Sequence, residues 1–149
     1  MGGKSTILRQ NCIAVILAQI GCFVPCASIK LTPVDRIFTR IGASDRLLEG
    51  KSTFFVEMEE CKNIIQYATN KSLAILDELG RGTSTFDGYS IAHSVLNYLI
   101  SKLKCRSMFS THYHMLLDDF KDREGVKCYH MSYKANESKD QVMFMYKFI

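Results

Sequence analysis

A glycine-lysine-serine turn near the amino terminus and a strand that ends in two carboxylates constrain this chain most. The turn is Gly2-Gly3-Lys4-Ser5-Thr6, and the strand is Leu73-Ala74-Ile75-Leu76 followed by Asp77-Glu78. Glycines before a lysine and a hydroxyl residue let consecutive backbone N–H groups point at phosphate oxygens. In such a loop Lys4 would neutralise the β- and γ-phosphates, and Ser5 would bind Mg²⁺. The five residues of the turn therefore predict a triphosphate site.

The two carboxylates after the strand predict the metal-binding and water-activating groups of this site. Asp77 is in the position of a residue that holds the metal ion, and Glu78 in that of one that activates water. A helix that starts at Ser5 or Thr6 would add its positive end to the same anion. Either stretch alone has an ordinary explanation, as a glycine turn capping a helix or as a strand entering a solvated turn. Their occurrence together favours nucleotide binding.

The phosphate-loop pattern, G-x-x-x-x-G-K-[ST], is longer than the stretch available before Ser5. We expect its first glycine and the two residues after it to lie upstream of Met1, and the domain to continue beyond Ile149. With fewer backbone donors, the chain alone is expected to bind Mg²⁺-ATP weakly and to show no turnover. On this interpretation an isolated chain could instead be a non-catalytic module that packs against a partner.

Composition describes one ordinary globular domain or part of one. The chain has 149 residues, 47% hydrophobic and 23% charged, which argues against disorder. The net charge of +4 is too small to indicate nucleic-acid binding. The six cysteines include no C-x-x-C pair, and Cys12, Cys61 and Cys105 fall in apolar segments. We therefore interpret them as reduced thiols rather than as a disulfide or zinc framework.

Hydrophobic periodicity predicts alternating helices and strands. Helices are expected over residues 6–20, 53–68, from near Ser84 to Leu103, and 112–120. Strands are expected over residues 22–24, 27–31, 34–41, 72–76, 105–110, 126–133 and 141–148, with loops at 42–50 and 134–140. Ser84 and Asp87 resemble a capping box. This order predicts a mainly parallel α/β sheet flanked by helices, with an antiparallel strand pair at its carboxyl-terminal edge.

Four ordered motifs identify a family resemblance that covers essentially the whole chain. They are Asp35-Arg36-Ile37-Phe38-Thr39-Arg40-Ile41-Gly42-Ala43, Ser52-Thr53-Phe54-Phe55-Val56-Glu57-Met58, Asp77-Glu78-Leu79-Gly80-Arg81-Gly82-Thr83-Ser84-Thr85-Phe86-Asp87-Gly88, and Ser110-Thr111-His112-Tyr113-His114. They resemble the carboxyl-terminal ATPase domain of MutS mismatch-repair proteins. Phe54-Phe55, Cys105-Arg106 and the final residues most resemble the mismatch-binding subunit of the eukaryotic heterodimer MutSα. A chromosome-maintenance or transporter ATPase is a lesser alternative, which the run from Thr83 to Gly88 disfavours.

The resemblance implies an ABC-type P-loop core whose ATP sites are shared between two subunits. It implies that Asp77 holds Mg²⁺, that Glu78 polarises the attacking water, and that His112 is a switch histidine near the γ-phosphate. Ser52 would reach the nucleotide of the partner subunit, and residues 80–85 would link the two sites. It also implies a second MutS-homologue partner, mismatched DNA bound by other parts of the parent protein, and a nuclear location.

Two of these residues also have simpler interpretations. Ser52 is a natural N-cap for the helix over residues 53–68, whether or not it also contacts phosphate. His112, taken without its neighbouring motifs, is more often a histidine that caps a helix. Both alternatives stay open at the level of sequence.

Overall fold

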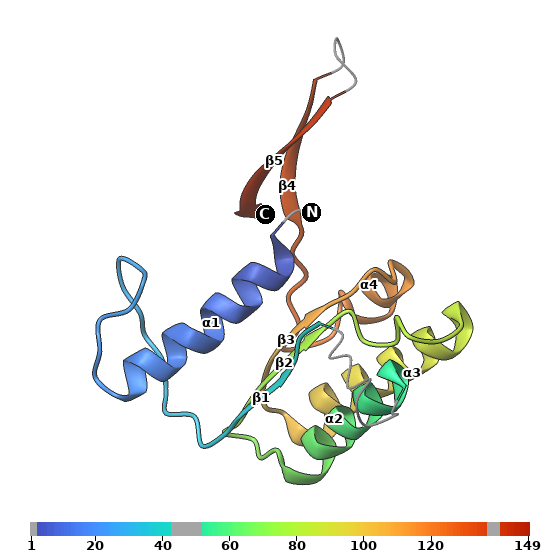
Figure 1. The fold of residues 1–149 in the computed structure, drawn as a ribbon, viewed down its shortest axis with the longest axis horizontal. Helices are drawn as coiled ribbons and strands as arrows, with labels where there is room; N and C mark the ends of the chain where they lie inside the picture. Colours follow the sequence, from blue (N-terminus) through green and yellow to red (C-terminus); the bar gives the residue numbers. More distant parts are fainter. Residues whose placement is uncertain (1–2, 43–51, 137–140) are drawn as a thin grey trace.

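The computed structural model describes residues 3–42, 52–136 and 141–149 (Figure 1). Its elements, in chain order, are α1 (Lys4–Gln19), β1 (Ile37–Arg40), α2 (Thr53–Tyr67), β2 (Leu73–Asp77), α3 (Thr85–Tyr98), the π-helical turn η2 (Leu99–Leu103), β3 (Arg106–Ser110), α4 (Met115–Phe120), β4 (Met131–Asn136) and β5 (Gln141–Phe148). Among the described residues, none of the helices has the length and apolar character needed to cross a membrane. The predicted loop at residues 42–50 lies, apart from Gly42, outside the described residues.

A three-stranded parallel sheet in the order β1-β2-β3 forms the centre of the fold. All residues of β2 are buried, as expected for a central strand that is covered on both faces. Ala74 and Leu76 pack among residues of α2 and α3, whereas Leu73 and Ile75 pack against α1. Figure 1 accordingly shows α1 on one side of the sheet and α2 and α3 on the other. The predicted parallel α/β architecture is confirmed.

The two long helices after the sheet's first strand begin at serine caps. Ser52 Oγ accepts a hydrogen bond from the backbone N–H of Phe55 at 3.2 Å. Ser84 Oγ accepts one from the N–H of Asp87, also at 3.2 Å. Each cap satisfies a backbone donor that the first helical turn leaves without a partner. The predicted capping roles of both serines are confirmed.

The predicted strands over residues 22–24 and 27–31 are wrong. This segment forms no strand, and Phe23 is fully exposed. The N–H of Cys26 bonds to the carbonyl of Val24 at 2.8 Å, which closes a tight turn instead. A β-prone run becomes a strand only where a neighbouring strand supplies hydrogen bonds, and the described part of the chain offers none here. In the third predicted run only Ile37–Arg40 pairs, because it lies beside β2.

The antiparallel pair forms, but its predicted place at the sheet edge is wrong. β4 and β5 pair with each other as a separate two-stranded sheet. Figure 1 shows this hairpin projecting away from the three-stranded sheet, near the start of α1. β4 starts later than predicted and continues to Asn136, into the predicted loop. Hairpin turns are local in sequence, whereas docking to an edge strand depends on long-range packing.

Not every apolar residue of α2 faces the core. Phe55 and Ile65 are exposed, while Cys61 and Ile64 are buried. Consecutive helical residues point about 100° apart, so a broad run of apolar residues cannot all face the core. The charged side chain of Glu57 is buried on this helix instead, with 2% of its surface exposed.

Candidate functional site

The candidate site lies where the three parallel strands end. Arg40, Asp77 and Ser110 are the last residues of β1, β2 and β3. The register pairs Asp77 with Ser110 across β2 and β3, and Arg40 with Leu76 across β1 and β2. Ligands of open α/β sheets bind outside the carboxyl ends of the strands. The topology therefore gathers these polar side chains at the expected edge.

A cavity of about 340 Å³ opens at this edge. It brings Ser5 of the predicted phosphate loop together with Asp77 and Glu78, which are far away in the sequence. Its lining residues are Ser5, Arg40, Gly42, Thr53, Glu57, Asp77, Glu78, Arg81 and Gly82. The hydroxyl and the two carboxylates predicted to act on one nucleotide thus line one cavity.

The amino end of α1 is suited to bind an anion. Gly3 has a φ of 85°, a left-handed conformation that favours glycine, and its carbonyl accepts from the N–H of Ile7 at 3.1 Å. The N-cap residue, Gly3, has no side chain with which to cap this end, and no acidic residue lies in its first turn. The N–H groups of a first helical turn and the helix dipole together favour a bound phosphate. A Cβ placed on Gly3 would lie 3.2 Å from Tyr146 Cδ1, so the β4–β5 hairpin packs beside this turn.

The two adjacent carboxylates have different environments. Asp77 is buried and accepts a hydrogen bond from the Ser110 hydroxyl at 2.5 Å. Glu78 is half-buried, and its side chain lies 2.9 Å from Arg81 Nη1 and 3.9 Å from Lys4 Nζ. Its φ of 51° is in the left-handed region, which non-glycine residues seldom adopt. Asp77 is thus held in place, and Glu78 is turned toward the basic groups of the cavity.

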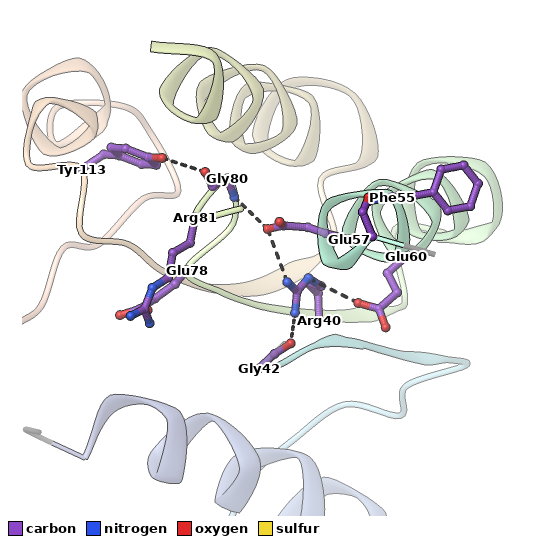
Figure 2. A network of polar contacts seen from close by, with 10 residues as sticks. Arg40, Gly42, Phe55, Glu57, Glu60, Glu78, Gly80, Arg81 and Tyr113 are labelled. Carbon is purple, nitrogen blue, oxygen red and sulfur yellow. Dashed lines mark hydrogen bonds and ion pairs between the residues drawn. The ribbon is translucent and has the colours of Figure 1, made fainter. Parts of the chain in front are cut away.

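A buried arginine connects β1 to α2 (Figure 2). Arg40 Nη2 lies 3.5 Å from Glu57 Oε1, and its Nε lies 3.3 Å from Glu60 Oε2. Its Nη1 donates to the carbonyl of Gly42. Arg40 and Glu57 are both nearly inaccessible to water. A buried ion pair needs such further partners, because desolvation of the two charges is costly.

The backbone of Gly80 is hydrogen-bonded on both sides. Its N–H donates to Glu57 Oε1 at 2.8 Å, and its carbonyl accepts from the Tyr113 hydroxyl at 3.0 Å. Burial and the negative charge of Glu57 raise the pKa of Tyr113, so its hydroxyl stays a donor. A Cβ on Gly80 would lie 2.4 Å from the carbonyl oxygen of Gly88. The loop after Glu78 is therefore packed directly against α3.

Several predicted site residues lie outside the cavity lining. Ser52 is exposed at the start of α2, and Thr6 is exposed on α1. His112 is exposed, and its ring centroid lies 4.1 Å from that of Tyr113. Gly2 lies outside the described residues. The structure thus brings Ser5, Asp77 and Glu78 together, with Lys4 beside them, and leaves Ser52 and His112 apart.

Sequence reasoning missed Arg40, Glu57 and Tyr113 as members of this site. Each lies inside a motif that carries the family resemblance, but the function was assigned to its neighbours. A glutamate on the apolar side of α2 was the available signal, since a charged residue at a core position needs a partner.

The residues present fit a magnesium-nucleotide better than a metal held by protein alone. Within the described ranges, no group of three or more His, Cys, Asp or Glu side chains is arranged to hold a metal ion. Mg²⁺ is commonly bound through one or two protein oxygens together with substrate phosphates and water. Ser5 and Asp77 could supply such oxygens.

Comparison with known proteins shows the family of this chain. The model of the family described as MutS domain V matches residues 1–149, the whole chain. The chain belongs to the MutS family. It is 53% identical over 154 residues to the DNA mismatch repair protein Msh6 of Gallus gallus and 52% identical over 147 residues to MSH6 of Saccharomyces cerevisiae. It is also 52% identical over 149 residues to MutS of Orientia tsutsugamushi.

These alignments cover nearly all of this MutS domain V chain but little of each relative. They include 100%, 99% and 100% of the chain, and 12%, 12% and 16% of the chicken, yeast and bacterial proteins, respectively. The chain thus corresponds to a small part of proteins named for DNA mismatch repair. The predicted resemblance to the MutS family, close to Msh6, is confirmed.

Proposed function

We propose that this MutS domain binds and hydrolyses ATP with Mg²⁺ and that it couples this reaction to DNA mismatch repair. The observation that carries the proposal is the single cavity lined by Ser5, Asp77 and Glu78. A hydroxyl, a buried carboxylate and a more exposed carboxylate at one helix end are the groups that phosphoryl transfer requires. Bound Mg²⁺ would neutralise charge on the phosphates.

Each residue has a distinct role in this proposal. Lys4 and the N–H groups of α1 bind the phosphates, and Ser5 and Asp77 hold the metal ion. Glu78 accepts a proton from the attacking water. Lys4 and Arg81 lie beside the Glu78 carboxylate and hold it at the cavity. Catalysis then depends on positioning and electrostatic stabilisation, without covalent chemistry.

The site is proposed to be completed by a second subunit. Ser52 is exposed at the amino end of α2 and lies outside the cavity lining, so it is available to a nucleotide held by a partner. The partner is proposed to be another MutS homologue, and His112 a switch residue near the γ-phosphate. Mismatched DNA would bind to parts of the larger protein. A nuclear location is proposed from the eukaryotic relatives, and a fluorescent fusion would test it.

A chimeric protein tests the proposal. The matching segment of the yeast relative is replaced by this chain, and the purified chimera is assayed for ATP hydrolysis with and without mismatched DNA. We expect Glu78→Gln to leave ATP binding intact and to slow single-turnover hydrolysis by ~10²-fold or more. Rapid-quench measurements give both quantities.

Glu124→Gln is the matched control, since it makes the same change at an exposed glutamate outside the cavity lining. Its hydrolysis rate should equal that of the unmodified chimera. If Glu78→Gln hydrolyses ATP as fast as Glu124→Gln does, Glu78 does not activate water. If the unmodified chimera has no ATPase activity, the proposed function is wrong.

A further inference from the structure

We propose that Glu57 is a positioning residue that fixes the loop carrying Glu78 by binding the backbone N–H of Gly80. Glu57 has no place in the chemistry proposed above, yet it is the most deeply buried charged residue of the described chain. For its kinetic consequence this inference rests on the proposed ATPase activity.

The geometry gives Glu57 one partner on each side. Its Oε1 accepts from Gly80 at 2.8 Å and lies 3.5 Å from Arg40 Nη2 (Figure 2). Its Oε2 lies 3.4 Å from the position that a Cβ on Gly82 would occupy. One carboxylate therefore binds Gly80, lies close to Gly82 and is paired with Arg40 at the end of β1.

The hydrogen bond from Gly80 to Glu57 lies next to a residue with an unfavourable backbone conformation. Glu78 has a φ of 51°, which is unfavourable for a residue with a Cβ. Such a conformation persists only where its surroundings enforce it. On one side the Glu78 N–H donates to the carbonyl of Ser110 at 3.0 Å, and on the other Gly80 is held by Glu57 and Tyr113. Removal of Glu57 would eliminate the hydrogen bond to the Gly80 N–H and let the Glu78 carboxylate move.

Arg40 has a supporting part in this arrangement. It compensates the buried charge of Glu57, since a carboxylate in so dry a place needs a cationic partner. Substitution of Glu57 alone would leave the buried Arg40 with only Glu60 and the Gly42 carbonyl as partners, which would destabilise the fold for a reason unrelated to Gly80. A useful test must therefore remove both charges and vary only the acceptor for Gly80.

The double variants R40M/E57Q and R40M/E57M meet this requirement. Their side chains at position 57 are similar in size, but only glutamine offers an oxygen to the Gly80 N–H. We expect R40M/E57M to have a kcat about tenfold or more below that of R40M/E57Q, with equal KM for ATP, because small misplacements of a catalytic group are costly. The assay is performed in the yeast chimera, with thermal melting to confirm that both variants fold.

Hydrogen exchange of the Gly80 amide, measured by NMR in the 149-residue chain, gives a second readout. It should be faster in R40M/E57M than in R40M/E57Q, and unaltered by Lys62→Met at an exposed position of α2. Equal kcat values in the two double variants, or equal Gly80 exchange, would overturn the inference. If the unmodified chimera hydrolyses no ATP, the proposed function fails, and Gly80 exchange alone decides whether Glu57 holds the loop.

Discussion

Ser110 donates a hydrogen bond to Asp77 across the parallel register of β2 and β3, at 2.5 Å. The bond ties the last residues of two strands, one of which carries the proposed metal-binding carboxylate. It occupies one oxygen of Asp77, a residue that lines the cavity.

Ser110→Ala should weaken the response of the chimera to Mg²⁺. Loss of a hydrogen bond that orients a metal ligand commonly costs 10–100-fold in affinity, so we expect half-maximal ATPase activity at about tenfold more Mg²⁺. Ser107→Ala, at an exposed serine of the same strand, should leave the titration unchanged. Coincident Mg²⁺ titrations of the two variants would exclude this role for Ser110.

Ser52→Ala should impair nucleotide-dependent closure of a dimer. In a mixed dimer, the defect should occur at the nucleotide bound by the partner subunit and not at the nucleotide bound by the mutant subunit. The lost N-cap itself should lower the free energy of unfolding by about 0.5–2 kcal/mol. Ser52→Asp separates the two effects, because aspartate caps a helix as well as serine but repels phosphate. We expect Ser52→Asp to melt like the unmodified protein and still fail in mixed dimers. A defect confined to the mutant subunit's own nucleotide would refute the role across the interface.

Gly80→Ala should be among the most destabilising substitutions in the chain. Its φ of +90° disfavours a side chain, and the added Cβ would lie 2.4 Å from the carbonyl oxygen of Gly88. Gly125→Ala is the control, since its φ is +80° and no atom of the described residues lies within 4 Å of its Cβ position. We expect about 1–2 kcal/mol from the backbone conformation alone at Gly125. At Gly80 we expect about 4 kcal/mol or more, measured by urea unfolding.

Equal losses of stability in the two alanine variants would show that contact between the loop and α3 contributes nothing.

The stability of the chain should fall at alkaline pH because of Cys61. Burial, and then the negative charge of Glu57, raise the pKa of this thiol to about 12 from its ordinary value of 9.0. In the folded state the thiol thus stays protonated where the unfolded chain ionises, so its contribution is complete below pH 9 and is lost as pH rises toward 12. The loss should approach about 1.4 kcal/mol per pH unit in this window.

Cys61→Val cannot ionise, so its free energy of unfolding should decline less steeply over the same pH range. Denaturant unfolding of both proteins at several pH values measures the difference. Parallel curves would contradict the assigned shift.

The sequence was sufficient for features that depend on neighbouring residues. The uninterrupted apolar run of β2 identified the central strand, since a strand covered on both faces needs apolar residues at every position. The serine caps of α2 and α3 were recognisable because a cap bonds to an N–H only three residues away. Ser5, Asp77 and Glu78 were found because their motifs record a local backbone geometry that the fold then brings to one cavity.

Tertiary structure alone decided the features that depend on distant partners. In the sequence, Glu57 is one polar residue within a helical pattern. It becomes a buried hydrogen-bond acceptor only because α2 packs against β1 and the loop at Gly80. The runs at residues 22–24 and 27–31 have β propensity, but the described chain places no strand beside them. The β4–β5 hairpin is a similar case. Its two strands are close in the sequence and their pairing could be predicted, but its separation from the three-stranded sheet depends on long-range packing. In each case the deciding free energy comes from contacts between segments, and sequence periodicity carries no record of them.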